Sequence, residues 1–218
     1  MKAGLFGGTF NPVHSGHVRV VSDILAFFPL NHIIVVPAGN PPHKQSDVIV
    51  DISHRLEMTR LAFKPLPQVI VSDVELNCND RSYTIDTVNY FLATLSSETK
   101  LYLIMGLDAF LEIDKWKSYM CLMHKAPVIV IKRPLPDGRS GQDMVKMFLQ
   151  MKVSDAYSFS SEQSCYFHPS LQPVYFHSSP EISISSSDIR TRLKNGRTVT
   201  GLIPDQVEKY IELKGLYQ

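Results

Sequence analysis

Cysteine is scarce in this chain of 218 residues, which contains only Cys78, Cys121 and Cys165. Their number is odd, their spacings are wide and no CxxC pair occurs. The sequence therefore predicts neither a disulfide framework nor a cysteine-bound zinc ion. This cysteine usage fits a reducing compartment, so we expect a cytoplasmic protein.

Net charge is also nearly absent, because the chain has 22 basic and 21 acidic residues and therefore a formal charge of +1. This balance argues against a nucleic-acid or membrane partner bound through a general basic field, but not against a small anionic ligand that needs only local charge. Polar residues and Pro29 interrupt the most apolar region, residues 18–36. We therefore expect neither a membrane span nor a secretory signal.

Apolar runs typical of buried strands alternate with helical patterns through residue 132. The sequence predicts strands over residues 2–6, 32–39, 68–76, 100–108 and 126–134. It predicts helices from about residue 16, over residues 53–63 with Ser53 as N-cap, over 84–95 and around 114–124. Such alternation is typical of an α/β fold with a doubly wound parallel sheet, which binds ligands at the carboxyl ends of its strands.

The rest of the chain is less regular. We expect a loop over residues 134–143, a helix over 144–151, a strand over 173–178 and helices over 185–196 and 203–217. Residues 155–172 give no assignable pattern. We expect one domain over residues 1–218, with a core over 1–180 in which the role of 135–180 is unassigned, and a small C-terminal helical part over 181–218.

The stretch GGTFNPVHSGH, residues 7–17, lies between the first expected strand and helix. Gly7 and Gly8 permit a tight turn and close approach of backbone N–H groups to a ligand, and Pro12 stiffens the loop. The helix start favours a phosphate, and His14 and His17 are spaced to lie on one face of its first turn. The alternative is a turn whose histidines only bond to the backbone. Neither G-x-G-x-x-G nor a P-loop motif is present, and no third ligand accompanies the histidines at a convincing interval for a metal.

A second candidate phosphate site is ISSSDIRTRL, residues 184–193. Hydroxyls and N–H groups at a helix start, with Arg190 one turn further on, can hold a polyanion through Ser185, Ser186 and Arg190. The alternative is a serine-capped helix with a solvated arginine. Lys44 in PPHK, residues 41–44, follows the second strand and is either a phosphate contact or an ordinary surface lysine.

The two stretches resemble the H-x-G-H and I-S-S-T-x-I-R motifs of the nucleotidyltransferase superfamily, with Ser187 where the family usually has Thr. The resemblance implies a Rossmann-like nucleotidyltransferase fold and an ATP site. It also implies that His14 and His17 are catalytic, that the ISSSDIR segment holds the β- and γ-phosphates, and that the loop with Lys44 lies over the triphosphate. The ATP-binding residues implied in this way are Gly7, Gly8, Thr9, Phe10, His14, His17, Lys44, Ser185, Ser186 and Arg190.

Three further stretches suggest an acceptor site: SYTIDT (82–87), GLD (106–108) and KWKSY (115–119). N–H groups near Thr84 at a helix start favour a carboxylate, Gly106 allows close approach, and Asp108 can accept hydrogen bonds from ribose hydroxyls. Trp116, the only tryptophan, can stack on a flat cationic ring. The alternatives are that Thr84 and Asp108 only cap helices and that Trp116 belongs to the core.

Taken together, these stretches resemble the family of bacterial nicotinate mononucleotide adenylyltransferases, from Gly7 through Arg133 and from Ser185 to Gly201. The resemblance implies adenylyl transfer from ATP to nicotinate mononucleotide, giving deamido-NAD and pyrophosphate, with Mg²⁺ carried by the phosphates. Trp116 would stack on the pyridine, and backbone amides near Thr84 and Tyr119 would receive the carboxylate. The implied mononucleotide-binding residues are Thr84, Gly106, Asp108, Trp116 and Tyr119. Residues 135–180 depart from the family by being longer.

Other functions remain open at this point. They are transfer to another acceptor such as phosphopantetheine, and nucleotide sensing without catalysis. A truncated class I aminoacyl-tRNA synthetase is disfavoured, because no K-M-S-K-S-like stretch occurs. The choice between nicotinate and nicotinamide and the oligomeric state also stay open.

Overall fold

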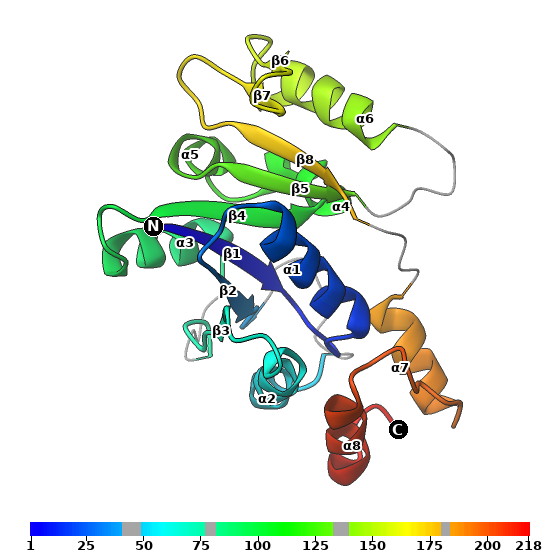
Figure 1. The fold of residues 1–218 in the computed structure, drawn as a ribbon. Helices are drawn as coiled ribbons and strands as arrows, with labels where there is room; N and C mark the ends of the chain where they lie inside the picture. Colours follow the sequence, from blue (N-terminus) through cyan, green and yellow to red (C-terminus); the bar gives the residue numbers. More distant parts are fainter. Residues whose placement is uncertain (41–48, 77–81, 133–139, 180–183) are drawn as a thin grey trace. The chain divides into compact units, whose positions relative to one another are not determined.

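The computed structural model describes residues 1–40, 49–76, 82–132, 140–179 and 184–218 (Figure 1). Its strands form one eight-stranded sheet in the order β3-β2-β1-β4-β5-β8-β7-β6. Most strand pairs are parallel, which confirms the predicted fold class, whereas β7 runs antiparallel to β6 and to β8. The strands are β1 (Lys2–Gly8), β2 (His32–Pro37), β3 (Val69–Val71), β4 (Lys100–Gly106), β5 (Val128–Lys132), β6 (Ser158–Ser160), β7 (Cys165–Phe167) and β8 (Val174–Ser178).

Helices lie between successive strands up to β6, and two further helices follow β8. They are α1 (Ser15–Phe27), α2 (Ile52–Phe63), α3 (Thr84–Thr94), α4 (Leu107–Phe110), α5 (Tyr119–Lys125), α6 (Gly141–Phe148), α7 (Ser186–Lys194) and α8 (Asp205–Lys214). A 3₁₀ turn, η2 (Ile113–Lys115), precedes α5, and a π-helical turn, η3 (Leu149–Val153), extends α6. None of the helices in the described ranges has the length and apolar character needed to cross a membrane.

The chain divides into two compact units. Unit 1 comprises Met1–Phe6 and Tyr83–Glu181, and unit 2 comprises Gly7–Ser82 and Ile182–Gln218. The sequence predicts a single domain, and whether the two units fold as one domain stays a prediction. Each unit is described by itself below.

Unit 1 is built on the buried strands β4 and β5 and on β8, which pairs with β5. Residues 155–172, which gave no pattern, contain the short strands β6 and β7 of an antiparallel hairpin. With three residues each, these strands are too short to produce a readable alternation of polar and apolar side chains. Helix α6 begins at Gly141 because the Ser140 hydroxyl accepts the Asp143 N–H, so the expected loop ends earlier than predicted.

Unit 2 contains β2 paired with β3, helices α1 and α2 packed against β2, and α8 packed against α2. The prediction that Ser53 caps α2 is wrong. Asp51 is the N-cap, and its carboxylate accepts the Ser53 N–H at 2.8 Å, because an anion complements the helix start better than a hydroxyl does. Strand β3 ends at Val71 rather than at Leu76, because a turn closes with the Leu76 N–H on the Asp73 carbonyl at 2.8 Å.

Candidate active site

The loop between β1 and α1 belongs to unit 2 from Gly7 onward. A Cβ at Gly8 would lie 2.8 Å from the Phe10 ring, so this position requires glycine, whereas a Cβ at Gly7 would meet nothing within 4 Å. Phe10 itself has a positive φ of 45° and is buried. The Phe10 ring thus packs against Gly8, whereas Gly7 is exposed. An exposed glycine lets a ligand come close to the backbone of the turn.

The two histidines are in direct contact at the start of α1. Their rings stack with centroids 3.6 Å apart, and the Phe10 ring meets His17 edge-on at 5.0 Å. His14 is the N-cap rather than a first-turn residue, and is 1% exposed, whereas His17 is half-buried in the first turn. The backbone N–H of His14 donates to His17 Nδ1 at 3.2 Å. Because Nδ1 accepts, the neutral ring of His17 carries its hydrogen on Nε2 and is a donor there.

Helix α7 contacts this loop within unit 2. The Ser186 hydroxyl donates to the Pro12 carbonyl at 2.9 Å. Arg190 donates through Nη1 to the Asn11 carbonyl at 2.8 Å and through Nη2 to the Ser187 hydroxyl at 3.2 Å. The structure therefore brings the two stretches together through hydrogen bonds to the loop backbone, between residues 174 and 179 positions apart in the sequence.

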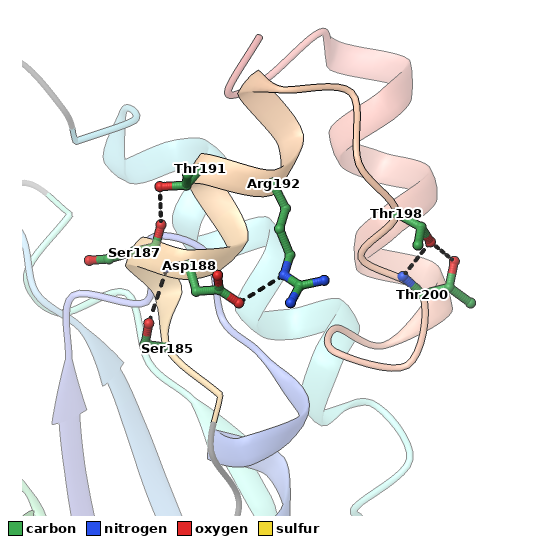
Figure 2. A network of polar contacts seen from close by, with 7 residues as sticks. All are labelled: Ser185, Ser187, Asp188, Thr191, Arg192, Thr198 and Thr200. Atoms are coloured by element: carbon green, nitrogen blue, oxygen red, sulfur yellow. Dashed lines mark hydrogen bonds and ion pairs between the residues drawn. The ribbon is translucent and has the colours of Figure 1, made fainter.

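The start of α7 has the capped geometry that the serines predict. The Ser185 hydroxyl accepts the Asp188 N–H at 3.1 Å, and the Asp188 carboxylate pairs with Arg192 at 2.9 Å. Figure 2 shows both contacts. On the same helix, the Thr191 hydroxyl donates to the Ser187 carbonyl. The Asp188–Arg192 pair offsets the acidic charge that the first turn would otherwise place near a bound anion.

Arg55 in α2 is a site-supporting residue that the sequence reasoning missed. It is 1% exposed, and its guanidinium donates to four carbonyls: Thr9 at 2.8 Å, Ala38 at 2.6 Å, Gly39 at 3.0 Å and Val50 at 2.8 Å. Burial lowers its pKa. A signal was available, because Arg55 occupies the same helical stripe as the buried residues Met58, Thr59 and Ala62.

The segment after β2 is held from two directions. Arg55 binds the carbonyls of Ala38 and Gly39, and the Glu75 carboxylate accepts the Gly39 N–H at 3.0 Å. This segment leads into residues 41–48, which contain Lys44. The predicted phosphate contact of Lys44 lies outside the described residues.

The predicted acceptor residues lie in unit 1, at the ends of β4, α3 and α5. Thr84 is the first residue of α3, and Tyr83 is its N-cap, so the Thr84 hydroxyl is not the cap. Strand β4 ends at Gly106, where a Cβ would lie 2.5 Å from Asp108 Oδ1, and Asp108 itself is exposed. The Asp108 carboxylate therefore folds over the glycine at the carboxyl end of the strand.

Trp116 is half-buried, which places it neither deep in the core nor fully in solvent. Its neighbour Lys117 pairs with Asp86 of α3 at 3.1 Å and lies 4.5 Å from the centre of the Tyr83 ring. Tyr119 starts α5 and donates to the Lys152 carbonyl at 3.1 Å. Within unit 1, these contacts join the Trp116 segment to the start of the helix that carries Thr84.

The described part of the chain contains no group of three or more His, Cys, Asp or Glu side chains arranged to hold a metal ion. Cys121 and Cys165 are free thiols, and Cys165 is buried. Cys78 lies outside the described residues.

Comparisons with known proteins identify the family of the chain. A family profile described as Cytidylyltransferase-like matches residues 5–192. A protein of Desulfatibacillum aliphaticivorans, named "Probable nicotinate-nucleotide adenylyltransferase", is 33% identical and is covered in full, as is this chain. A protein of the same name from Thermoanaerobacter sp. is 35% identical over all of this chain and 95% of its own.

A similar solved structure is the nicotinic acid mononucleotide adenylyltransferase of Plasmodium falciparum complexed with NaAD, with a TM-score of 0.75. It is 19% identical, and the match covers 99% of this chain and 97% of that one. At this identity the likeness supports the fold, whereas the curated relatives support the family. The chain therefore belongs to the Cytidylyltransferase-like family and, within it, to the nicotinate-nucleotide adenylyltransferases.

Proposed function

We propose that the protein transfers the adenylyl group of ATP to nicotinate mononucleotide, giving deamido-NAD and pyrophosphate, in NAD biosynthesis. Family membership supports this reaction. The structural observation that carries it is the pair of stacked histidines at the start of α1, beside a glycine loop that α7 holds by its backbone. A phosphate at this helix start meets the positive end of the helix dipole and a ring N–H donor.

In this mechanism a phosphate oxygen of the mononucleotide attacks the α-phosphorus of ATP. The new P–O bond forms as the bond to the β-phosphate bridging oxygen breaks, and the electron pair leaves with pyrophosphate. The attacking oxygen is already an anion at neutral pH, so no general base is needed. Catalysis then rests on positioning and on stabilising charge in the transition state.

His17 is the residue to which we assign the direct contact, because its Nε2–H is a donor and its ring is the more exposed of the two. His14 stays in the proposal as the second catalytic histidine, stacked on His17 and set to act on the neighbouring phosphate. Gly7, Gly8, Thr9 and Phe10 supply the loop around the triphosphate. Lys44, Ser185, Ser186 and Arg190 stabilise the leaving pyrophosphate.

For the acceptor, we propose that Trp116 stacks on the pyridine ring and that the backbone amides at Thr84 and Tyr119 receive the carboxylate. Asp108, beside Gly106, binds ribose hydroxyls. Mg²⁺ enters as the partner of the ATP phosphates, whose charge it neutralises. We place the reaction in the cytoplasm, in keeping with the cysteine usage, and propose small molecules rather than nucleic acid or membrane as its partners.

A panel of acceptors tests the proposal. Purified protein, ATP and Mg²⁺ are incubated separately with nicotinate mononucleotide, nicotinamide mononucleotide and phosphopantetheine, and pyrophosphate release is measured. Release that is fastest with the nicotinate compound supports the assignment. Preference for phosphopantetheine would move the protein to another acceptor class, and no release with any acceptor would leave a nucleotide sensor as the better explanation.

A further inference from the structure

The chain beyond α8 returns to the loop that carries the histidines. Helix α8 ends at Lys214, its C-cap Gly215 has a left-handed φ of 60°, and the Leu216 N–H bonds the Ile211 carbonyl at 3.1 Å. Tyr217 also has a left-handed backbone, with φ of 66°. A residue with a Cβ adopts this conformation at a cost, so its contacts must stabilise it there.

The stabilising contact is a hydrogen bond between residues 206 positions apart in the sequence. The Tyr217 hydroxyl donates to Asn11 Oδ1 at 2.7 Å, and the same oxygen accepts the Val50 N–H at 3.2 Å. Arg190 binds the backbone carbonyl of Asn11 at 2.8 Å. Asn11 is 5% exposed, and all four residues belong to unit 2. Side chain and backbone of Asn11 are thus both held, three residues before His14.

We propose that Tyr217 is a positioning residue for adenylyl transfer: by holding the Asn11 side chain, it fixes the loop that sets His14 and His17. The inference rests on the proposed function for its link to catalysis. The Tyr217 hydroxyl is engaged by Asn11, so it acts through the loop and not on the phosphates. Arg190 and Val50 keep their own bonds to Asn11 when this hydroxyl is removed, so the loop loosens while the fold persists.

The expected effect is on turnover. Small displacements of catalytic groups reduce rate steeply, and a shift of about 1 Å can cost about 100-fold. Because the bonds of Val50 and Arg190 to Asn11 remain, we expect Tyr217→Phe to lower kcat about tenfold. KM for ATP and for nicotinate mononucleotide should change by less than about threefold, because the residues that contact them are retained.

Tyr210 offers a matched control in the same helix region. Its hydroxyl bonds His54 Nδ1 at 2.9 Å, which links α8 to α2. Tyr210→Phe removes the same atom and one hydrogen bond from the same unit. Both variants should lower Tm by similar amounts, and only Tyr217→Phe should lower kcat. Equal kcat values for the two variants would overturn the proposal, as would a Tyr217→Phe kcat within twofold of wild type.

A double-mutant cycle separates positioning from general destabilisation. If Tyr217 acts through Asn11, then adding Tyr217→Phe to Asn11→Ala changes kcat by less than twofold, because the acceptor is already gone. A further tenfold loss in the Asn11→Ala background would contradict the proposed route. Should Tyr217→Phe not fold, Asn11→Ala removes the other half of the bond and is compared with Tyr210→Phe in the same way.

An activity-independent measurement keeps this proposal distinct from the proposed function. In protein labelled at histidine, Tyr217→Phe should shift the ring resonances of His14 and His17, whereas Tyr210→Phe should shift that of His54. If the wild-type protein releases no pyrophosphate with any acceptor, the proposed function fails. These resonances still show whether Tyr217 holds the loop that carries His14 and His17. Unchanged His14 and His17 resonances in Tyr217→Phe would overturn it.

Discussion

Arg55→Met should destabilise the protein more than any other single change of an arginine considered above, because one buried side chain serves four carbonyls. At about 1 kcal/mol net for each hydrogen bond, the loss amounts to about 4 kcal/mol, a large share of a typical stability of about 5–15 kcal/mol. Methionine fills much of the same space, so the change reports the polar contacts more than a cavity. Arg55→Lys keeps the charge, but one ammonium cannot reach all four carbonyls, and we expect about half the loss.

Urea unfolding provides the measurement, with Arg60→Met as the control on the same helix. Arg60 is exposed and has an ion pair with Asp73 at 3.2 Å, so its replacement should cost less than about 1 kcal/mol. If Arg55→Met changes the free energy of unfolding by no more than Arg60→Met does, the four bonds do not stabilise the fold and the reasoning fails.

The same experiment tests whether units 1 and 2 unfold together. Circular dichroism follows helices in both units, whereas the fluorescence of Trp116, the only tryptophan, follows unit 1. Arg55 is in unit 2, so a shared shift of both midpoints supports the single domain predicted from the sequence. A Trp116 midpoint that stays at its wild-type value would make two independently unfolding units the better description.

Three further outcomes are expected. His17→Ala should lower turnover by about 100-fold or more, the scale for loss of one electrostatic donor, and near-normal turnover in the pyrophosphate assay would remove His17 from the mechanism. Trp116→Ala should raise KM for the mononucleotide far more than KM for ATP, and equal changes would return Trp116 to the core. Burial raises the pKa of Tyr217, so above pH 10 the unfolded chain loses this proton before the folded one does, and stability falls as pH rises. The free energy of unfolding is measured by urea unfolding for the wild type and Tyr217→Phe at several values between about pH 8 and 11. Above pH 10, the difference between the two proteins should shrink by up to about 1.4 kcal/mol per pH unit. A difference that stays constant over this range would contradict the reasoning.

How far the sequence predicts the structure depends on whether a contact leaves a local pattern. The opening loop was readable, because its glycines and histidines lie within eleven residues between a strand and a helix. The bond between Tyr217 and Asn11 was not, since it joins residues 206 positions apart and no local pattern marks the two residues as partners. Arg55 lies between these cases, because its place on a buried stripe marked it and only the structure shows its four acceptors.

Helix ends were the least predictable feature. Ser53 looked like the N-cap of α2, but the Asp51 carboxylate two residues earlier accepts the Ser53 N–H, so the helix begins before Ser53. The hairpin of β6 and β7 was missed because pairing stabilises strands of three residues that have no pattern of their own.

The long sequence separation between the histidine loop and its anchors has a consequence for biosynthesis. Ribosomes add about 5–20 residues per second, so the 206 residues between Asn11 and Tyr217 take about 10–40 s to translate. During that interval the histidine loop exists without the hydroxyl and the guanidinium that hold it, which come from Tyr217 and Arg190. A nascent chain therefore acquires an anchored histidine loop only as translation reaches α7 and the residues beyond α8.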